Sequence, residues 1–326
     1  MNLSLVIPVY NEEQNLPDLS DAIHTALAVF QSEWEVIFVD DGSRDGSLNV
    51  LKDLVSKDPQ HVRVVSFRRN FGQTAAIAAG IDHSIGEIVV LLDADLQNDP
   101  SDILMMIGKL NEGYDVVSGY RKDRKDKFIT RTIPSRLANG LISWVTGVHL
   151  HDYGCTLKAY RRDVLDNIRL YGEMHRFIPV YAHAIGARIT EVQVQHHPRR
   201  YGQTSYGLER TLKVLLDLLT VKFLLSYAAK PIYLFGGAGA SLILVSAITL
   251  FILLVRRIFF SISVLASPFF QMSVMFFVLG FQSILMGLIA ELLVRTYHES
   301  QHKPTYTVRE RFNFNQIDHD RLEKHA

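Results

Sequence analysis

Residues 87–97 read EIVVLLDADLQ, an apolar run that is followed directly by two aspartates, Asp93 and Asp95. A short run of this kind, rich in β-branched residues, predicts a buried strand that ends just before the aspartates. Similar runs recur at residues 3–9, 35–39, 62–67 and 115–118. The first of them has no basic flank and is followed by the polar sequence YNEE, which predicts a strand and not a targeting signal.

Stretches with the composition of helices lie between these predicted strands, at residues 13–30, 47–56, 74–84 and 100–111. Regular alternation of strand and helix predicts a mostly parallel sheet with helices on both faces. We therefore expect residues 1–120 to form an α/β domain of the Rossmann-like type.

The composition narrows the class of protein. The chain has 326 residues, of which 48% are hydrophobic, enough to build a core in one large domain or two smaller ones. Its 34 Lys and Arg residues balance its 34 Asp and Glu residues, which argues against nucleic acid as the main partner. The single cysteine, Cys155, cannot form an internal disulfide, so no oxidising compartment is indicated.

Two long stretches without a charged residue, 232–255 and 268–290, lie in the C-terminal third of the chain. At roughly 1.5 Å per residue the first reaches about 36 Å, more than a hydrocarbon core of about 30 Å. The short link at 256–267 predicts a hairpin of two transmembrane helices within residues 231–295, with both of its ends on one side of the membrane.

Basic residues flank this hairpin on the side of the α/β domain, at Lys222, Lys230, Arg295, Lys303, Arg309 and Arg311. They outnumber Arg256 and Arg257 in the link. The positive-inside rule therefore predicts a multi-pass protein of the inner or plasma membrane. Its domain at 1–207 and its tail at 296–326 are expected to be cytoplasmic, and the polar tail to be partly disordered.

Residues 208–230 have two different faces. Polar residues recur every three or four positions at Arg210, Lys213, Asp217 and Thr220, and leucine and phenylalanine fill the other side. This spacing predicts an amphipathic helix. The helix could pack on its own domain; because it runs straight into a span, we favour an interfacial helix that lies on the membrane.

Polar residues also follow three predicted strands where each strand ends: PVYNE at 8–12, DDGS at 40–43, and the aspartate pair with Gln97. The carboxyl ends of parallel strands are where α/β sheets bind ligands. Two carboxylates one residue apart, with an amide carbonyl, can bind Mg²⁺ or Mn²⁺, and that cation can stabilise a leaving diphosphate. Taken alone, each motif is also typical of a solvated turn; together they predict a site for a nucleotide carrying a diphosphate.

Taken in order, these motifs resemble those of the inverting nucleotide-sugar glycosyltransferases with the GT-A fold. More narrowly, the chain is similar to the polyprenyl-phosphate glycosyltransferases, which include the dolichyl-phosphate mannose synthases and the bactoprenol glucosyltransferases. Further matches are RNFG at 69–72, GYR at 119–121, DYGCTLKAY at 152–160 and RRYGQT at 199–204. The resemblance covers about residues 1–210, and the two predicted spans resemble the bacterial members.

The resemblance implies a role for each matching residue. The nucleotide pocket would be lined by Pro8, Tyr10, Glu12 and Asp41. Asp93, Asp95 and Gln97 would hold the metal, Mg²⁺ or Mn²⁺, and through it the diphosphate. The lipid phosphate would be bound by Arg121, Arg131, Ser135 and Arg199. Asp152 would position the sugar or act in the transfer, which makes Asp93, Asp95 and Asp152 the candidate catalytic residues.

One position departs from the family pattern. The family commonly has a lysine after Gly-x-Ser, whereas GQTS at 202–205 ends in Ser205. One cationic contact to a phosphate is therefore missing here or supplied elsewhere.

The chemistry of the acceptor agrees with this resemblance. A lipid monophosphate is largely ionised near neutral pH, so it can attack without a dedicated general base and needs in-line placement and arginine contacts. We therefore expect metal-dependent, inverting transfer of a hexose, glucose from UDP-glucose being favoured, to polyprenyl (undecaprenyl) phosphate at the cytoplasmic face of the membrane. The resemblance also implies a homotetramer.

Several alternatives stay open. The same chemistry could use GDP-mannose or UDP-aminoarabinose, or the chain could be a non-catalytic membrane protein that binds nucleotide sugars or moves glycolipid. A processive polysaccharide synthase is disfavoured because the chain has no Gln-x-x-Arg-Trp element. A zinc enzyme is disfavoured because the histidine pairs at 149/151 and 196/197 are more typical of surface or packing positions, and an ATPase is disfavoured because the Gly-x-x-x-x-Gly-Lys loop does not occur.

Overall fold

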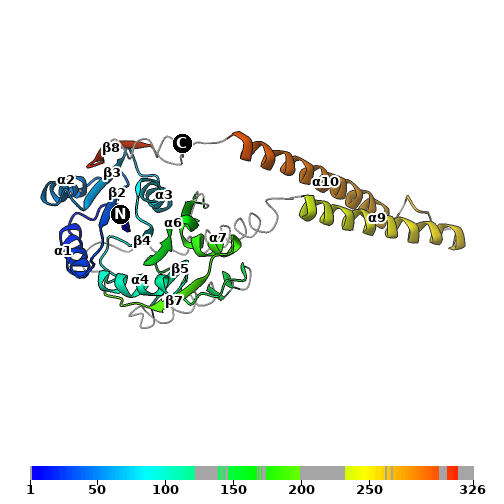
Figure 1. Cartoon of the computed structure of the whole chain (residues 1–326). Helices are drawn as coiled ribbons and strands as arrows, with labels where there is room; N and C mark the ends of the chain where they lie inside the picture. Colours follow the sequence, from blue (N-terminus) through cyan, green and yellow to red (C-terminus); the bar gives the residue numbers. More distant parts are fainter. Residues whose placement is uncertain are drawn as a thin grey trace. The chain divides into compact units, whose positions relative to one another are not determined.

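The computed structural model describes residues 2–121, 139–140, 142–143, 146–166, 168, 170, 174–198, 232–260, 263–265, 267–300 and 307–314. The chain divides into two compact units. One is an α/β unit of Met1–Leu218 together with Lys303–Ala326, and the other is a helical unit of Leu219–His302 (Figure 1).

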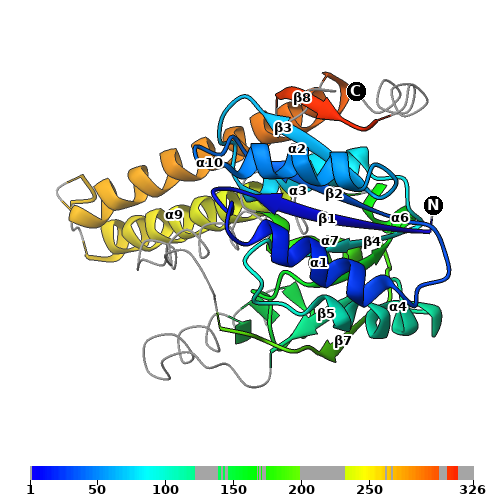
Figure 2. The same cartoon turned by 90° about the vertical axis from the view of Figure 1, so that its left-hand side faces the viewer.

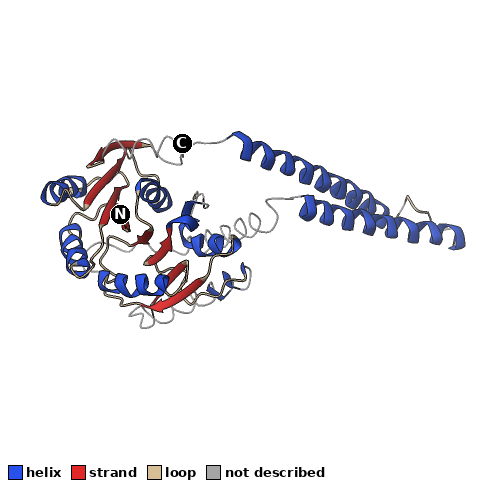
Figure 3. Ribbon diagram, in the orientation of Figure 1, coloured by secondary structure: helices blue, strands red, loops and turns tan. Residues whose placement is uncertain are grey.

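The α/β unit is built on one eight-stranded sheet in the order β7-β5-β6-β4-β1-β2-β3-β8. Its strands are drawn in red in Figure 3. Its strands are β1 Leu3–Val9, β2 Trp34–Asp40, β3 Val62–Phe67, β4 Ile88–Leu91, β5 Val116–Tyr120, β6 Lys158–Arg161, β7 Ile189–Gln193 and β8 Val308–Phe312. Strands β1 to β4 are parallel, as is the pair β5 and β7. Strand β6 is antiparallel to β4 and β5, and β8 is antiparallel to β3. The predicted mostly parallel α/β sheet is therefore confirmed.

Helices cover both faces of this sheet. They are α1 Leu16–Leu27, α2 Ser47–Lys57, α3 Gln73–His83, η1 Pro100–Asp102, α4 Ile103–Asn111, α6 Arg162–Asp166, η3 Met174–Phe177 and α7 Ile178–Ala184. Apolar residues of α1, α2 and α4 pack in one core with Val36 and Phe38 of β2, whereas α3 packs on Ile37 and Val39. Successive side chains of β2 point to opposite faces of the sheet and so enter two different cores. Figures 1 and 2 show α1 and α3 on these opposite sides.

Helix α3 lies unusually close to the sheet. Its sequence, QTAAIAAGIDH, is rich in small residues, and Gly80 is buried against Val6 of β1. A methyl group at Gly80 would overlap Cγ1 of Val6. The small residues therefore allow α3 to lie close to β1.

The C-terminal segment contributes a strand that the sequence did not indicate. Strand β8 pairs with β3, and Nδ2 of Asn313 donates hydrogen bonds to the backbone oxygens of Pro59 (2.6 Å) and Val62 (2.8 Å). The ring of Phe314 lies beneath the guanidinium of Arg63. Part of the polar tail is thus an edge strand of the α/β sheet, while residues 315–326 lie outside the described residues.

The helical unit contains α9, Ile232–Phe260, and α10, Pro268–Ser300. Within them, Phe235–Phe260 and Pro268–Ala290 are long and apolar enough to cross a membrane. Both helices are longer than the predicted spans, because α9 continues through Arg256 and Arg257 and α10 continues beyond Ala290. The predicted link at 256–267 is correspondingly shorter. The amphipathic helix predicted at 208–230 lies outside the described residues.

Two contacts of small residues join α9 to α10. A methyl group at Gly239 would lie 2.5 Å from the backbone oxygen of Gly280, and one at Gly280 would lie 2.7 Å from that of Gly239. Seven residues along each helix, the buried hydroxyls of Ser246 and Ser273 lie 3.1 Å apart, and each hydroxyl donates to the backbone oxygen of the other residue. Close backbone approach and hydrogen bonds are the contacts that hold apolar helices together in lipid. The pair is therefore a packed antiparallel hairpin.

The packing of α3 gives a test of the fold. We expect Gly80→Ala to lower the free energy of unfolding by about 1–3 kcal/mol, because the added methyl group must displace Val6 or the helix. Gly108→Ala is the matched control: Gly108 is an exposed glycine in α4 with nothing within 4 Å of the added carbon. It should raise stability by about 0.5–1 kcal/mol. Thermal midpoints of the detergent-solubilised chain measure both, and equal effects would contradict the close packing of α3.

Candidate active site

A cavity of about 340 Å³ lies at the carboxyl ends of β1 to β4. Its wall includes residues that follow each of these strands, the end of β5, the segment before β6 and part of η3. The parallel strands bring their carboxyl ends to the same edge, which is why residues far apart in the sequence meet here.

The four residues predicted to bind a nucleotide, Pro8, Tyr10, Glu12 and Asp41, all line this cavity. The carboxylate of Asp41 accepts hydrogen bonds from the backbone N–H groups of Phe71 (2.6 Å) and Gly72 (2.9 Å). Burial raises the pKa of Asp41 above its usual value, and these two bonds oppose that shift. The carboxylate is therefore fixed in direction, and it connects the end of β2 to the segment after β3.

The aspartate pair follows β4 and faces the same cavity. Asp93 accepts hydrogen bonds from Nε2 of Gln73 (2.8 Å) and from Oγ1 of Thr156 (2.6 Å). Asp95 accepts one from the backbone N–H of Gln97 (3.1 Å). Burial and, next, the negative charge of Asp95 raise the pKa of Asp93 to about 6. Like charges are held close together here, and the charges of Arg121 and Lys158 oppose the rise in pKa only in part.

This donor set fits a divalent metal ion. Two carboxylates and the amide of Gln97 line the cavity and offer only hard oxygen ligands, as Mg²⁺ and Mn²⁺ prefer. A divalent cation between Asp93 and Asp95 would also relieve the repulsion that raises the pKa of Asp93. The predicted metal residues are thus brought together with suitable chemistry.

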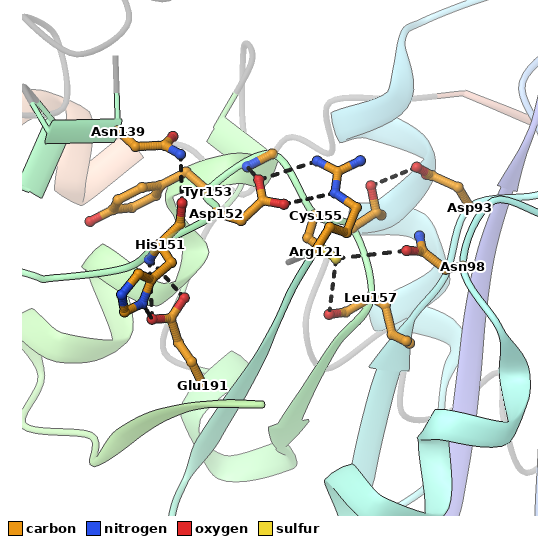
Figure 4. Close-up of polar contacts among 12 residues, drawn as sticks. Asp93, Asn98, Arg121, Asn139, His151, Asp152, Tyr153, Cys155, Leu157 and Glu191 are labelled. Atoms are coloured by element: carbon orange, nitrogen blue, oxygen red, sulfur yellow. Dashed lines mark hydrogen bonds and ion pairs between the residues drawn. The ribbon is translucent and has the colours of Figure 1, made fainter. Parts of the chain in front are cut away.

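Arg121 and Asp152 form a buried ion pair. Nε of Arg121 donates to Oδ2 of Asp152 (2.7 Å) and Nη2 donates to Oδ1 (3.2 Å), while the backbone N–H of Gly154 donates to the same carboxylate (3.1 Å) (Figure 4). Arg121 lines the cavity, and Asp152 is 2% exposed. The sequence analysis gave these residues separate roles, in lipid-phosphate binding and in sugar placement. In the structure they form one unit, in which Asp152 orients the guanidinium.

The remaining predicted phosphate-binding residues, Arg131, Ser135 and Arg199, lie outside the described residues, as does Ser205. Their roles stay predictions.

The structure adds cavity residues that the sequence analysis did not single out. Nζ of Lys158, which is buried, donates hydrogen bonds to the backbone oxygens of Tyr153 (3.4 Å) and Cys155 and so holds the segment before β6. Burial lowers the pKa of Lys158 and raises the pKa of the Cys155 thiol to about 11, so Cys155 stays protonated and is not a nucleophile. Both residues lie in the motif at 152–160, so that motif could have indicated them as cavity residues.

On the other wall, Oγ1 of Thr74 lies 2.7 Å from Nδ1 of the buried His175, and Arg176 follows in η3. Thr74 begins the turn of α3 next to Gln73, the donor to Asp93. No motif marked His175 or Arg176, because they follow no predicted strand.

Comparison with known proteins identifies the family of the chain. The pattern of glycosyl transferase family 2 matches residues 4–169. The chain therefore belongs to glycosyl transferase family 2, and it is a glycosyltransferase with the GT-A fold.

Two relatives match almost the whole chain. It is 40% identical over 316 residues to the dodecaprenyl-phosphate galacturonate synthase of Rhizobium johnstonii, with 96% of this chain and 94% of that one covered. It is 36% identical over 308 residues to the undecaprenyl-phosphate 4-deoxy-4-formamido-L-arabinose transferase of Proteus mirabilis, with coverage of 94% and 92%. The resemblance to polyprenyl-phosphate glycosyltransferases is therefore confirmed.

Among solved structures, the chain resembles glucosyl-3-phosphoglycerate synthase from Mycobacterium tuberculosis in complex with Mn²⁺, UDP and phosphoglyceric acid. The TM-score is 0.52 at 20% identity, over 68% of this chain and 78% of that one. This likeness supports the fold of the α/β unit.

The buried histidine gives a pH-dependent prediction. Burial, followed by the charges of Arg176 and Lys158, lowers the pKa of His175 to about 3 from an ordinary value of 6.5. The unfolded chain then binds a proton that the folded chain does not, so stability is complete above pH 6.5 and falls as the pH drops toward 3, by up to about 1.4 kcal/mol per unit. His175→Gln should remove this contribution. Thermal midpoints in detergent at pH 7.5, 6.5 and 5.5 test it; a difference between variant and wild type that does not change with pH would contradict it.

Proposed function

We propose that this enzyme transfers one hexose from a nucleotide sugar to a polyprenyl phosphate, with inversion at the anomeric carbon. The observation that carries the proposal is the cavity that joins Asp41, Asp93 and Asp95 to the Arg121–Asp152 pair. The two relatives named above, whose names specify dodecaprenyl and undecaprenyl phosphate, support the acceptor because they match nearly the full length of the chain.

The donor side follows from the first half of the sheet. Pro8, Tyr10, Glu12 and Asp41 line the part of the cavity that would hold the nucleotide. The fixed carboxylate of Asp41 can accept hydrogen bonds from the base or the ribose on the side not used by Phe71 and Gly72. Asp93, Asp95 and Gln97 would hold Mg²⁺ or Mn²⁺, and a bound cation would offset the charge that develops on the leaving diphosphate.

The acceptor side follows from the second half. An ionised lipid phosphate is itself the nucleophile, so the protein must place it in line and needs no residue to remove a proton. A guanidinium can contact a carboxylate and a phosphate together, so Arg121 could bind the lipid phosphate while it is paired with Asp152. Asp152 would then keep Arg121 in position, and Arg131, Ser135 and Arg199 would complete the phosphate site.

The proposal also concerns the identity of the donor sugar. We favour a UDP-sugar and retain glucose from UDP-glucose as the first donor to test. Galacturonate and 4-deoxy-4-formamido-L-arabinose, which the names of the relatives specify, are the next. The two helices long enough to span a membrane support an integral membrane protein, with the α/β unit cytoplasmic and a homotetramer as the proposed assembly.

A donor panel tests the reaction. We expect the purified full chain, with Mn²⁺ or Mg²⁺ and undecaprenyl phosphate, to move label from one UDP-sugar into the organic phase. The panel contains radiolabelled UDP-glucose, UDP-galacturonate, the UDP-formamido sugar and GDP-mannose. Transfer that depends on both metal and lipid supports the proposal, and the donor that works names the sugar. Bound nucleotide without transfer from any donor would favour a binding or accessory role instead.

A substitution in the aspartate pair tests the metal site. We expect Asp95→Asn to lower kcat by on the order of 100-fold or more, because it removes one of two anionic ligands while keeping the shape of the side chain. Asp53→Asn is the control, since Asp53 is an exposed residue of α2 away from the cavity. Full activity of the Asp95→Asn enzyme over a range of Mn²⁺ concentrations would exclude Asp95 as a ligand.

A further inference from the structure

Among the residues that the structure describes, three cationic side chains line the cavity: Arg121, Lys158 and Arg176. Arg121 is paired with Asp152, and the ammonium of Lys158 is hydrogen-bonded to two backbone oxygens. Arg176 differs from both, because it forms no ion pair or hydrogen bond with any residue in the described part of the chain. It is thus a guanidinium at the cavity wall whose donors are available to a ligand.

The backbone of Arg176 is nevertheless held firmly. It lies in η3 between His175 and Phe177, which are both buried, as is Met174. His175 is tied to Thr74 at the start of α3. The preceding residue of α3, Gln73, donates to Asp93. The first two residues of α3 therefore connect the segment that carries Arg176 to the aspartate pair through hydrogen bonds.

The charge of Arg176 acts inside the cavity. It is one of the charges that lower the pKa of His175 and of Lys158. His175 is uncharged near neutral pH, so it neither competes for an anion nor compensates the guanidinium. Arg176 is half-buried and has no counter-ion among the described residues, so its guanidinium would gain from an oxyanion, which its planar fork can bind through two hydrogen bonds.

We propose that Arg176 is a substrate-binding residue whose guanidinium pairs with an oxyanion of the sugar donor. This inference rests on the proposed function and extends it, because it assigns a donor contact to a wall of the cavity that no motif marked. Two donor oxyanions have the required chemistry: the diphosphate, which every nucleotide sugar carries, and the carboxylate of a uronate sugar.

Binding and kinetics of the full chain in detergent separate these sources. The probes are UDP with Mn²⁺ in titration calorimetry, and UDP-glucose and UDP-galacturonate in transfer assays at saturating undecaprenyl phosphate. For Arg176→Gln we expect the Kd of UDP, or the KM of a UDP-sugar, to rise on the order of 10- to 100-fold. A rise for UDP and both sugars identifies the diphosphate, and a rise confined to UDP-galacturonate identifies the carboxylate. Arg176→Lys, which keeps the charge, should recover part of the loss.

Arg188→Gln is the matched control, because Arg188 is an exposed arginine stacked on Tyr114 outside the cavity. It should leave both constants unchanged. Thermal midpoints of all three variants show whether the fold is intact, and Arg176→Lys keeps the test open if Arg176→Gln does not fold.

Unchanged donor constants in a folded Arg176→Gln enzyme, or a change in the KM of the lipid alone, would overturn the inference while leaving the proposed function in place. If the wild-type enzyme transfers no sugar but binds UDP, the proposed function fails. The UDP titration then still decides whether Arg176 binds the diphosphate.

Discussion

The carboxylate of Asp93 connects the parts of the chain that surround the cavity. Asp93 follows β4, and it accepts hydrogen bonds from Gln73 on α3 and from Thr156 in the segment before β6. Burial and the charge of Asp95 disfavour its ionised form, so these two donors are needed to hold an anionic carboxylate in one orientation. Helix α3 extends the connection through Thr74 to His175. The close packing of α3 on β1, which Gly80 permits, therefore bears directly on the geometry of the site.

The distribution of charge in the cavity explains why a metal ion belongs to the proposed reaction. Glu12, Asp41, Asp93 and Asp95 all line the wall, whereas Arg121 and Lys158, two of the three lining cations in the described part of the chain, already have partners. A nucleotide diphosphate is an anion, and this wall would repel it unless a divalent cation lay between the aspartate pair and the phosphate oxygens. The same reasoning supports a role for Arg176, because a guanidinium that has no partner among the described residues can offset the charge of a diphosphate. Catalysis here would then depend on charge placement more than on proton transfer.

Strands β1 to β4 could be predicted because both faces of each are buried, so each reads as a short, predominantly apolar run. Because the carboxyl ends of parallel strands share one edge of a sheet, Asp41, Asp93 and Asp95 could be predicted to lie close together, and they line one cavity. Strand β8, VRERF, could not be found in this way, because this edge strand has three charged residues in a row and its partner lies far earlier in the chain. The pairing of Arg121 with Asp152 likewise depends on β6 lying beside β5, which no local pattern reveals. Charge at Arg256 marked the edge of an apolar stretch and not the end of α9.

The helical hairpin is an insertion in the α/β unit and not an appendage at its end. The chain leaves that unit after Leu218 and returns at Lys303, and the returning segment is held by the pairing of β8 with β3. The hairpin is itself a packed pair, joined at Gly239 and Gly280 and at Ser246 and Ser273. An acceptor whose phosphate cannot enter hydrocarbon presents that group only at the membrane surface. The proposed in-line attack on the donor therefore depends on how the site places a phosphate that stays at that surface.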